Sequence, residues 1–237
     1  SAGLLALLRV GNRDYRHVVA ADLAFAVAPR LNAAGRLEDM SVGIRCLMTD
    51  DHEEALALAA ELDALNQERK TVQAEMQEEA FGQVRELLAG LREDALPAGL
   101  CLFQAGWHQG VIGILASRIK EQFHRPVIAF AQAGDGELKG SARSVAGLHV
   151  RDALDAIATR HPGLITRFGG HAMAAGLTIR ESKLVRFKAL AEKQMARLYP
   201  GADLSGAIVT DGPLPGKAMN LEFARSLRTA GPWGSGF

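Results

Sequence analysis

A long helical pattern between residues 51 and 90 is the feature that most constrains how this chain can fold. Apolar side chains recur there in steps of three, four or seven residues, at Leu58, Leu62, Leu65, Val72, Met76, Ala80, Val84, Leu87 and Leu91. This spacing predicts one helix with a single apolar face, and Asp50 with Glu53 is typical of its beginning. Because such a helix would be about 60 Å long, longer than a small domain is wide, we expect it to connect two domains. A coiled coil is the alternative, but the apolar seam is interrupted around Arg69 and Glu79.

The helix separates two segments with different patterns. Residues 1–48 have no hydrophobic periodicity of their own and are few for an independent core, so we expect the end of a domain and the least ordered part of the chain. From residue 98 onward we predict strands at 100–104, 127–130, 137–144 and 174–179, and helices at 111–123, 150–159 and 182–198. This order indicates an α/β fold in which helices cover a mixed sheet, preceded by the long connecting helix.

The last segment, residues 201–237, contains a predicted strand at 207–210 and a predicted helix at 221–229. It closes on a glycine-rich stretch that carries Trp233 and Phe237, and large aromatic side chains are rarely left unpacked in such a stretch. We therefore expect the sequence to be a fragment of a longer protein.

The charge balance excludes a strongly basic coat protein. Lys plus Arg and Asp plus Glu each number 27, so the net charge is zero, although a local basic patch can still bind nucleic acid. No apolar run approaches the roughly 18 residues of a membrane span, and the first ten residues lack the cationic start of a signal peptide. Cys46 and Cys101 stand in apolar surroundings without a Cys-x-x-Cys spacing, so we expect two buried thiols and a cytoplasmic protein.

The segment 167–176 contains the most unusual candidate site. Gly169 and Gly170 expose backbone N–H groups and permit positive φ, and His171 adds a donor or a metal-capable nitrogen. The small residues that follow let a ligand approach closely, so the segment suits an anion such as phosphate. The alternative is a tight turn packed against a sheet, with His171 hydrogen-bonded in the interior.

A second candidate site lies at the end of the predicted strand 137–144. Alternation places Lys139, Ser141 and Arg143 on one face, and Ser144 follows directly. A hydroxyl beside a guanidinium can clamp a phosphate, because both donate hydrogen bonds to its oxygens. An exposed edge strand is the alternative interpretation.

Two weaker candidates lie elsewhere in the chain. Arg30, Asn32 and Arg36 flank small residues in a segment that is equally typical of a surface loop. Trp107 and His108 stand in a strand-to-helix turn, where ligands often bind in α/β folds, or where Trp107 simply packs on the sheet. The sequence contains no Walker A loop, GxGxxG, HExxH or zinc-ligand spacing, and no aspartate cluster for two divalent metals.

In this order, the motifs at 29–36, 107–113, 140–144 and 168–176 resemble those of the bacterial single-strand-specific 5′→3′ DNA exonucleases of the DHH phosphoesterase superfamily. The resemblance implies a layout of four segments: 1–48, the end of the DHH catalytic domain; 49–97, an interdomain helix and linker; 98–200, the DHH-associated domain; and 201–237, the lead-in to a missing OB-fold. The aspartates and the Asp-His-His motif that hold Mn²⁺ or Mg²⁺ in that family are absent from this sequence. We therefore expect no metal ligand and no cofactor here, and an inactive fragment.

The resemblance also implies roles for the candidate residues. Arg36, Ser141 and Arg143 would contact the 5′ phosphate and backbone of single-stranded DNA, and His171 would have a supporting catalytic role. The remaining expected substrate-binding residues are Arg30, Asn32, Trp107, His108, Ser144, Gly169 and Gly170. The intact protein would act in DNA repair and recombination, with a single-strand-binding protein and a helicase as partners and without a membrane.

Two other functions stay open. One is an oligonucleotide or cyclic-dinucleotide phosphodiesterase of the same superfamily, against which the tail helix and the closing Gly-Pro-Trp-Gly stretch count. The other is a non-catalytic nucleic-acid-binding module, against which the connecting helix and the Asn-Ala-Ala-Gly-Arg motif count.

Overall fold

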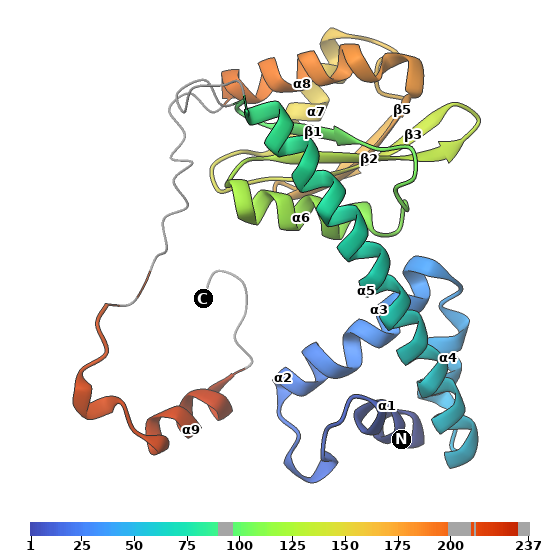
Figure 1. Ribbon diagram of the computed structural model, residues 1–237, viewed down its shortest axis with the longest axis vertical. Helices are drawn as coiled ribbons and strands as arrows, with labels where there is room; N and C mark the ends of the chain where they lie inside the picture. Colours follow the sequence, from blue (N-terminus) through green and yellow to red (C-terminus); the bar gives the residue numbers. More distant parts are fainter. Residues whose placement is uncertain (90–96, 199–209, 211, 232–237) are drawn as a thin grey trace. The chain divides into compact units, whose positions relative to one another are not determined.

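The computed structural model describes residues 1–89, 97–198, 210 and 212–231. These residues form two compact units: residues 1–70 with the described part of 209–237, and the described part of 71–208. The boundary lies inside helix α5 (His52–Leu88), a continuous helix of 37 residues, so the predicted long helix is confirmed (Figure 1).

The residue that caps α5 is Asp51, not Asp50 as we predicted. The Asp51 carboxylate accepts hydrogen bonds from the backbone N–H groups of Glu53 and Glu54 at 2.8 and 3.1 Å. A cap residue must directly precede the first helical turn to reach these groups, and Asp50 stands one position too early.

A five-stranded mixed sheet forms the centre of the second unit, which confirms the predicted fold class. Its order is β1-β2-β3-β5-β4, with β1 parallel to β2 and the other neighbours antiparallel. The strands are β1 (Leu100–Phe103), β2 (Val127–Gly134), β3 (Glu137–Arg143), β4 (Arg167–Gly170) and β5 (Ala174–Arg180).

The strand β4 corrects our expectation of a glycine-rich loop before the last strand of the sheet. Gly169 pairs with Gly176 and Gly170 with Ala175, so the two glycines belong to the ladder between β4 and β5. Adjacent glycines lower strand propensity, and antiparallel pairing with the following strand β5 outweighs this preference.

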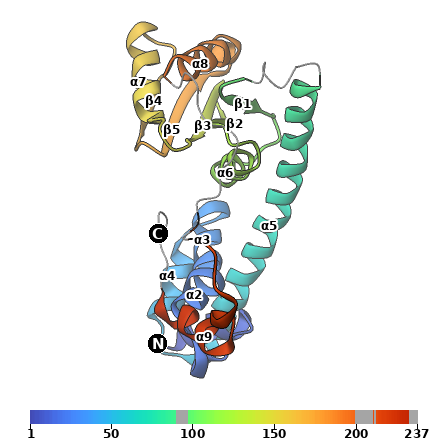
Figure 2. The same ribbon diagram turned by 90° about the vertical axis from the view of Figure 1, so that its left-hand side faces the viewer.

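Helices cover both faces of the sheet (Figure 1, Figure 2). Helix α6 (Ile112–Phe123) packs against β2 and β3 on one face, while α7 (Val150–Arg160) and α8 (Leu184–Leu198), preceded by the 3-10 turn η4 (Glu181–Lys183), share a core with the other face. Phe130 of β2 and Phe187 of α8 meet edge to face in that core, with ring centroids 5.4 Å apart. All three helices lie close to their predicted positions.

Short helical elements precede α5 in the first unit, and residues from several of them share a core with its first half. They are α1 (Ala2–Val10), η1 (Tyr15–His17), α2 (Ala20–Asp22), the π-helical turn η2 (Leu23–Val27), α3 (Ala28–Leu37) and α4 (Ser41–Met48). Leu7 and Cys46 are fully buried together with Leu62 of α5. Helices α1 and α4 approach so closely that a Cβ on Gly3 would collide with the carbonyl oxygen of Cys46. The core of residues 1–48 is thus completed by α5, which explains why the segment lacks a periodicity of its own.

An ion pair joins α3 to α5 in this core. Arg30 Nη2 lies 2.7 Å from Asp63 Oδ1, and the two side chains are 11% and 30% exposed. We expect Asp63→Asn to destabilise the first unit by about 1–3 kcal/mol, because the buried guanidinium keeps its charge and loses its counter-charge. Hydrogen exchange of the amides in residues 1–48 measures the effect, with Glu61→Gln as the exposed control on the same helix.

Equal protection in these two variants would contradict the proposed role of the ion pair. The same exchange data test our expectation that residues 1–48 are the least ordered part of the chain.

The described part of the tail contains η5 (Gly216–Ala218) and α9 (Leu221–Ala230), the latter close to the predicted helix at 221–229. Residues 207–209 of the predicted strand, and Trp233 and Phe237, lie outside the described residues. None of the helices in the described part of the chain combines the length and the apolar character that crossing a membrane requires.

The two cysteines are free thiols in protected positions. Cys46 is buried, and Cys101 is half-buried as a residue. Burial raises the pKa of the Cys101 thiol to about 12, so it stays protonated and a poor nucleophile at neutral pH.

Candidate functional site

Ser141 and Arg143 lie on β3 and face the first turn of α6. Leu138 and Ala142 of β3 are buried in the core beneath α7 and α8, so alternation turns Ser141 and Arg143 to the opposite face. A Cβ added to Gly113 in the first turn of α6 would come within 2.8 Å of Arg143 Nη2 and 3.2 Å of Ser141 Oγ. Glycine at this position therefore leaves room for the guanidinium at the beginning of the helix.

Two hydrogen bonds orient the Arg143 side chain. Its Nη1 donates to Ser141 Oγ at 3.0 Å and to the carbonyl oxygen of Ala142 at 2.8 Å. A guanidinium, a hydroxyl and the positive end of a helix dipole thus meet at one place, an arrangement that attracts an anion. The alternative of an exposed edge strand is wrong, because β3 lies between β2 and β5.

The turn between β1 and α6 holds Trp107 and His108. Trp107 is 3% exposed, and its Nε1 donates to Glu79 Oε2 of α5 at 2.8 Å. His108 is half-buried, and its Nδ1 accepts a hydrogen bond from the Gly110 N–H at 3.1 Å. In the neutral ring the proton is then on Nε2, so His108 presents a donor on its other side.

The Gly-Gly-His segment is the end of β4 and the turn into β5. Gly170 has φ +141°, and a Cβ there would collide with the carbonyl oxygen of Ala174 and lie 2.5 Å from Ala175 Cα. The His171 N–H donates to the Ala174 carbonyl oxygen at 2.7 Å. The His171 residue is exposed, so the alternative of a histidine bonded in the interior is wrong.

Backbone hydrogen bonds bring this turn to the same end of the sheet as Arg143. In the ladder Arg143 is the partner of Ala174, and the N–H of Ser144 donates to the Met173 carbonyl oxygen at 2.9 Å. Ser144 is 1% exposed, and its Oγ donates to the Leu148 carbonyl oxygen at 2.7 Å, so its hydroxyl supports the loop after β3. The structure therefore brings residues 141–144 and 169–171, parts of two of the predicted segments, to one end of the sheet, whereas Lys139 lies toward the other end of β3.

Arg30, Asn32 and Arg36 belong to helix α3 of the first unit, which corrects the expectation of a loop. Asparagine and glycine lower helix propensity, but burial of Ala33 and Ala34 against the core outweighs this preference. Arg30 points inward to its ion pair and also donates from Nη1 to the Ala26 carbonyl oxygen at 2.5 Å. Asn32 and Arg36 are exposed and, four residues apart, lie on the same side of α3.

Sequence reasoning missed Arg69 of α5, which lies near Arg36. Its Nη2 donates to Oδ1 of the buried Asn66 at 2.9 Å. Burial, and then the charge of Arg36, lowers the pKa of Arg69 below its usual value. The charge of Arg36 on α3 therefore acts on the guanidinium of Arg69 on α5. The local sequence does not distinguish Arg69 from the other cationic residues of α5, and the packing of α3 on α5 is needed to identify it.

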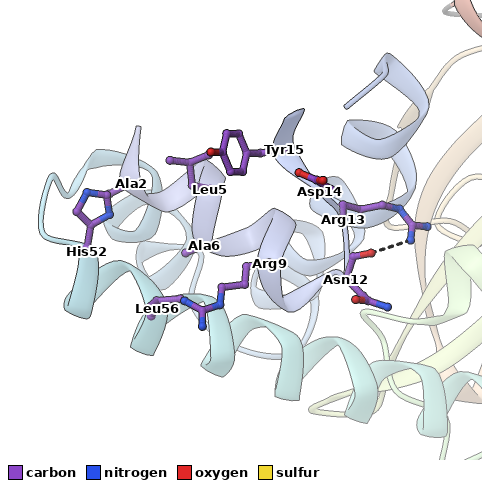
Figure 3. Close-up of a pocket in the computed structure, with 10 residues that line it drawn as sticks. All are labelled: Ala2, Leu5, Ala6, Arg9, Asn12, Arg13, Asp14, Tyr15, His52 and Leu56. Carbon is purple, nitrogen blue, oxygen red and sulfur yellow. Dashed lines mark hydrogen bonds between the residues drawn. The ribbon is translucent and has the colours of Figure 1, made fainter. Parts of the chain in front are cut away.

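A cavity of about 610 Å³ in the first unit contains none of the predicted site residues (Figure 3). It is bordered by α1, by the turn that carries Tyr15, and by the beginning of α5 with His52. The neighbouring Asp51 caps α5, and hydrogen bonds from the backbone N–H groups of Glu54 and Glu53 lower its pKa. Among the described residues, no group of three or more His, Cys, Asp or Glu side chains could hold a metal ion.

Comparison with known proteins agrees with this architecture. Residues 97–197 match the family described as the DHHA1 domain. The chain is 54% identical over 235 residues to the single-stranded-DNA-specific exonuclease RecJ of Escherichia coli, a match that covers 99% of this chain and 40% of the relative. RecJ of Thermus thermophilus is 36% identical over 217 residues, covering 92% of this chain and 29% of the relative. The chain thus spans less than half the length of these relatives.

Solved structures show the same likeness. A crystal structure of Thermus thermophilus RecJ in complex with Mg²⁺ has a TM-score of 0.70 and 36% identity, covering 83% of this chain and 28% of that one. A crystal structure of an exonuclease RecJ bound to manganese has a TM-score of 0.67 and 34% identity, covering 87% of this chain and 49% of that one.

Proposed function

Because the chain carries a DHHA1 domain and resembles RecJ exonucleases over almost its whole length, we propose that it is the 5′-end-binding part of a single-stranded-DNA 5′→3′ exonuclease. The observation that carries the proposal is the contact of Ser141 and Arg143 with the first turn of α6. A terminal phosphate is a dianion whose oxygens match the fork of a guanidinium, and the helix dipole adds to the attraction.

The residues around this pair have distinct roles in the proposal. Gly169 lets the first nucleotide approach the end of β4, and the exposed His171 next to it donates a hydrogen bond to that nucleotide in a supporting catalytic role. His108 presents its Nε2 proton at the turn before α6. Ser144 and Trp107, whose polar atoms are engaged inside the protein, position the loops that carry the contacts.

The first unit contributes contacts to the strand backbone. Asn32 and Arg36 present a hydrogen-bonding and a cationic side chain on one side of α3, and Arg69 adds a second charge. Phosphate contacts of this kind supply affinity without reading sequence. Arg30 supports them indirectly, because its ion pair with Asp63 holds α3 against α5.

The hydrolytic step is not assigned to this chain. The RecJ structures that the chain resembles contain Mg²⁺ or manganese, and the chain covers only 40% of RecJ of Escherichia coli. We propose that Mn²⁺ or Mg²⁺ is held by other parts of the intact protein and that the chain alone is inactive. In this proposal residues 1–48 are the end of a DHH catalytic domain, and residues 49–97 are the helix and linker that connect it to the DHH-associated domain at 98–200. Residues 201–237 lead into an OB-fold. The intact protein acts in DNA repair and recombination in the cytoplasm, with a single-strand-binding protein and a helicase.

Fluorescence anisotropy with labelled single strands tests the proposal. We expect the chain to bind a 5′-phosphorylated strand about tenfold more tightly than the same strand with a 5′ hydroxyl, because the phosphate adds charge-assisted hydrogen bonds. The affinity falls as salt is added, since phosphate binding releases counterions. Equal affinity for the two strands at every salt concentration would contradict 5′-phosphate recognition by this chain.

A further inference from the structure

The second half of α5 is hydrogen-bonded to the turn that begins α6. Trp107 of that turn is 3% exposed and donates from Nε1 to Glu79 Oε2 at 2.8 Å. One helical turn further along α5, Gln83 Nε2 donates to the Phe103 carbonyl oxygen and to Gln104 Oε1, both at 3.3 Å. The end of β1 and the beginning of the turn are therefore both held by α5.

The Glu79–Trp107 contact is the stronger of these two connections. A buried indole N–H requires an acceptor, and leaving it without one carries the full cost of its desolvation. A carboxylate is a better acceptor than a carbonyl, because its charge strengthens the bond. The side chain of Trp107 is consequently fixed by a residue from a different element, and the position of the turn follows that of Glu79.

The same turn sets the position of the anion site. Six residues after Trp107 comes Gly113, whose Cα approaches Arg143 and Ser141 so closely that even a Cβ would crowd them. Local backbone hydrogen bonds link the residues between Trp107 and Gly113, among them one from the Val111 N–H to the His108 carbonyl oxygen at 3.0 Å. A shift of the turn would therefore move the first turn of α6 against the guanidinium of Arg143.

We propose that Glu79 is a positioning residue for 5′-phosphate binding, which it controls by holding Trp107 and with it the beginning of α6. The inference rests on the proposed function and adds that α5 determines the geometry of the phosphate site. Glu79 touches no ligand in this proposal. Its effect on binding passes through Trp107.

Trp107 itself reports on the contact. The chain contains two tryptophans, so Trp233→Phe leaves Trp107 as the only one. In this background we compare Glu79→Ala, Glu79→Gln and, as a matched control, Glu78→Ala, whose side chain is 79% exposed on the same helix. The two readouts are the Trp107 emission maximum and the affinities for 5′-phosphorylated and 5′-hydroxyl strands.

We expect Glu79→Ala to shift the Trp107 emission and to lower the affinity for the phosphorylated strand about five- to tenfold, with little change for the hydroxyl strand. Glu79→Gln keeps an acceptor oxygen and should retain most of the affinity, while Glu78→Ala should change neither readout. If Glu79→Ala shows no cooperative unfolding transition, Trp107→Phe takes its place, because it removes the same hydrogen bond and keeps an aromatic ring in the core. This variant has no tryptophan emission in the Trp233→Phe background, so the affinities for the two strands are its readout.

The outcomes separate the inference from the proposed function. A changed emission with an unchanged preference for the phosphorylated strand overturns the positioning role and leaves the proposed function standing. A parent chain without any preference for the phosphorylated strand overturns both. An equal loss of affinity for the two strands in Glu79→Ala also contradicts the inference, since it indicates general damage to the fold.

Discussion

Replacing Arg143 by alanine is expected to lower the affinity for a 5′-phosphorylated single strand by about ten- to a hundredfold, the equivalent of about 1.4–2.7 kcal/mol. The guanidinium is oriented by Ser141 and by the Ala142 carbonyl oxygen, so its contribution to phosphate binding needs little further ordering. The affinity for a 5′-hydroxyl strand should change much less. Anisotropy titrations at several salt concentrations measure both, and the salt dependence should weaken by about one phosphate contact.

Two variants control for charge and for fold. Like Arg143, Arg180 donates a hydrogen bond to a backbone carbonyl oxygen, that of Asp135. It lies at the other end of β5, so Arg180→Ala removes an equivalent charge away from the phosphate site. It should leave the preference for the phosphorylated strand unchanged. Arg143→Lys keeps the charge and loses the fork, so it should recover only part of the affinity. Equal losses in Arg143→Ala and Arg180→Ala would show that the chain responds to total charge and not to a phosphate site.

The sequence pattern predicts those parts of the structure whose signals are local. Apolar residues recur with helical spacing along α5 from Leu58 to Leu87, about eight turns. This local pattern predicts the helix without information from distant parts of the chain. Alternation places Ser141 and Arg143 on one side of β3, and the structure agrees. Alternation does not predict which element these two side chains face. Gly113 comes close to them because α6 packs on the sheet, which is a tertiary contact.

The differences arise where distant contacts outweigh local preference. Arg30, Asn32 and Arg36 stand among residues typical of a loop, yet Ala33 and Ala34 bury against the core and keep the segment helical. The sequence alone suggests that Arg30 is a ligand-binding cation. Its ion-pair partner Asp63 is 33 residues away on α5, so the pair becomes visible only in the folded structure. Arg69 is likewise inconspicuous in the sequence of α5, and only the packing of α3 brings it within reach of the charge of Arg36.

The two glycines of the Gly-Gly-His segment differ in what the fold requires of them. Gly170 has φ +141°, and a Cβ would lie 2.5 Å from Ala175 Cα, so this glycine is required by the backbone. A Cβ added to Gly169 would have no other atom within 4 Å, so the fold has room for an alanine at this position. If Gly169 is needed at all, it is needed by something that approaches from outside.

We therefore expect Gly170→Ala to destabilise the second unit by about 2–5 kcal/mol, through backbone strain and collision, and Gly169→Ala to change its stability by no more than about 0.5 kcal/mol. Gly169→Ala should nevertheless weaken binding of the phosphorylated strand, because the added methyl group occupies the approach of the first nucleotide. Urea unfolding followed by Trp107 fluorescence in the Trp233→Phe background measures stability, and anisotropy measures binding.

Gly82→Ala, also in open space but on α5, is the control that should leave binding intact. Unchanged binding in Gly169→Ala would exclude close approach of the nucleotide at the end of β4, whereas equal stability of the Gly169→Ala and Gly170→Ala variants would contradict the strained turn.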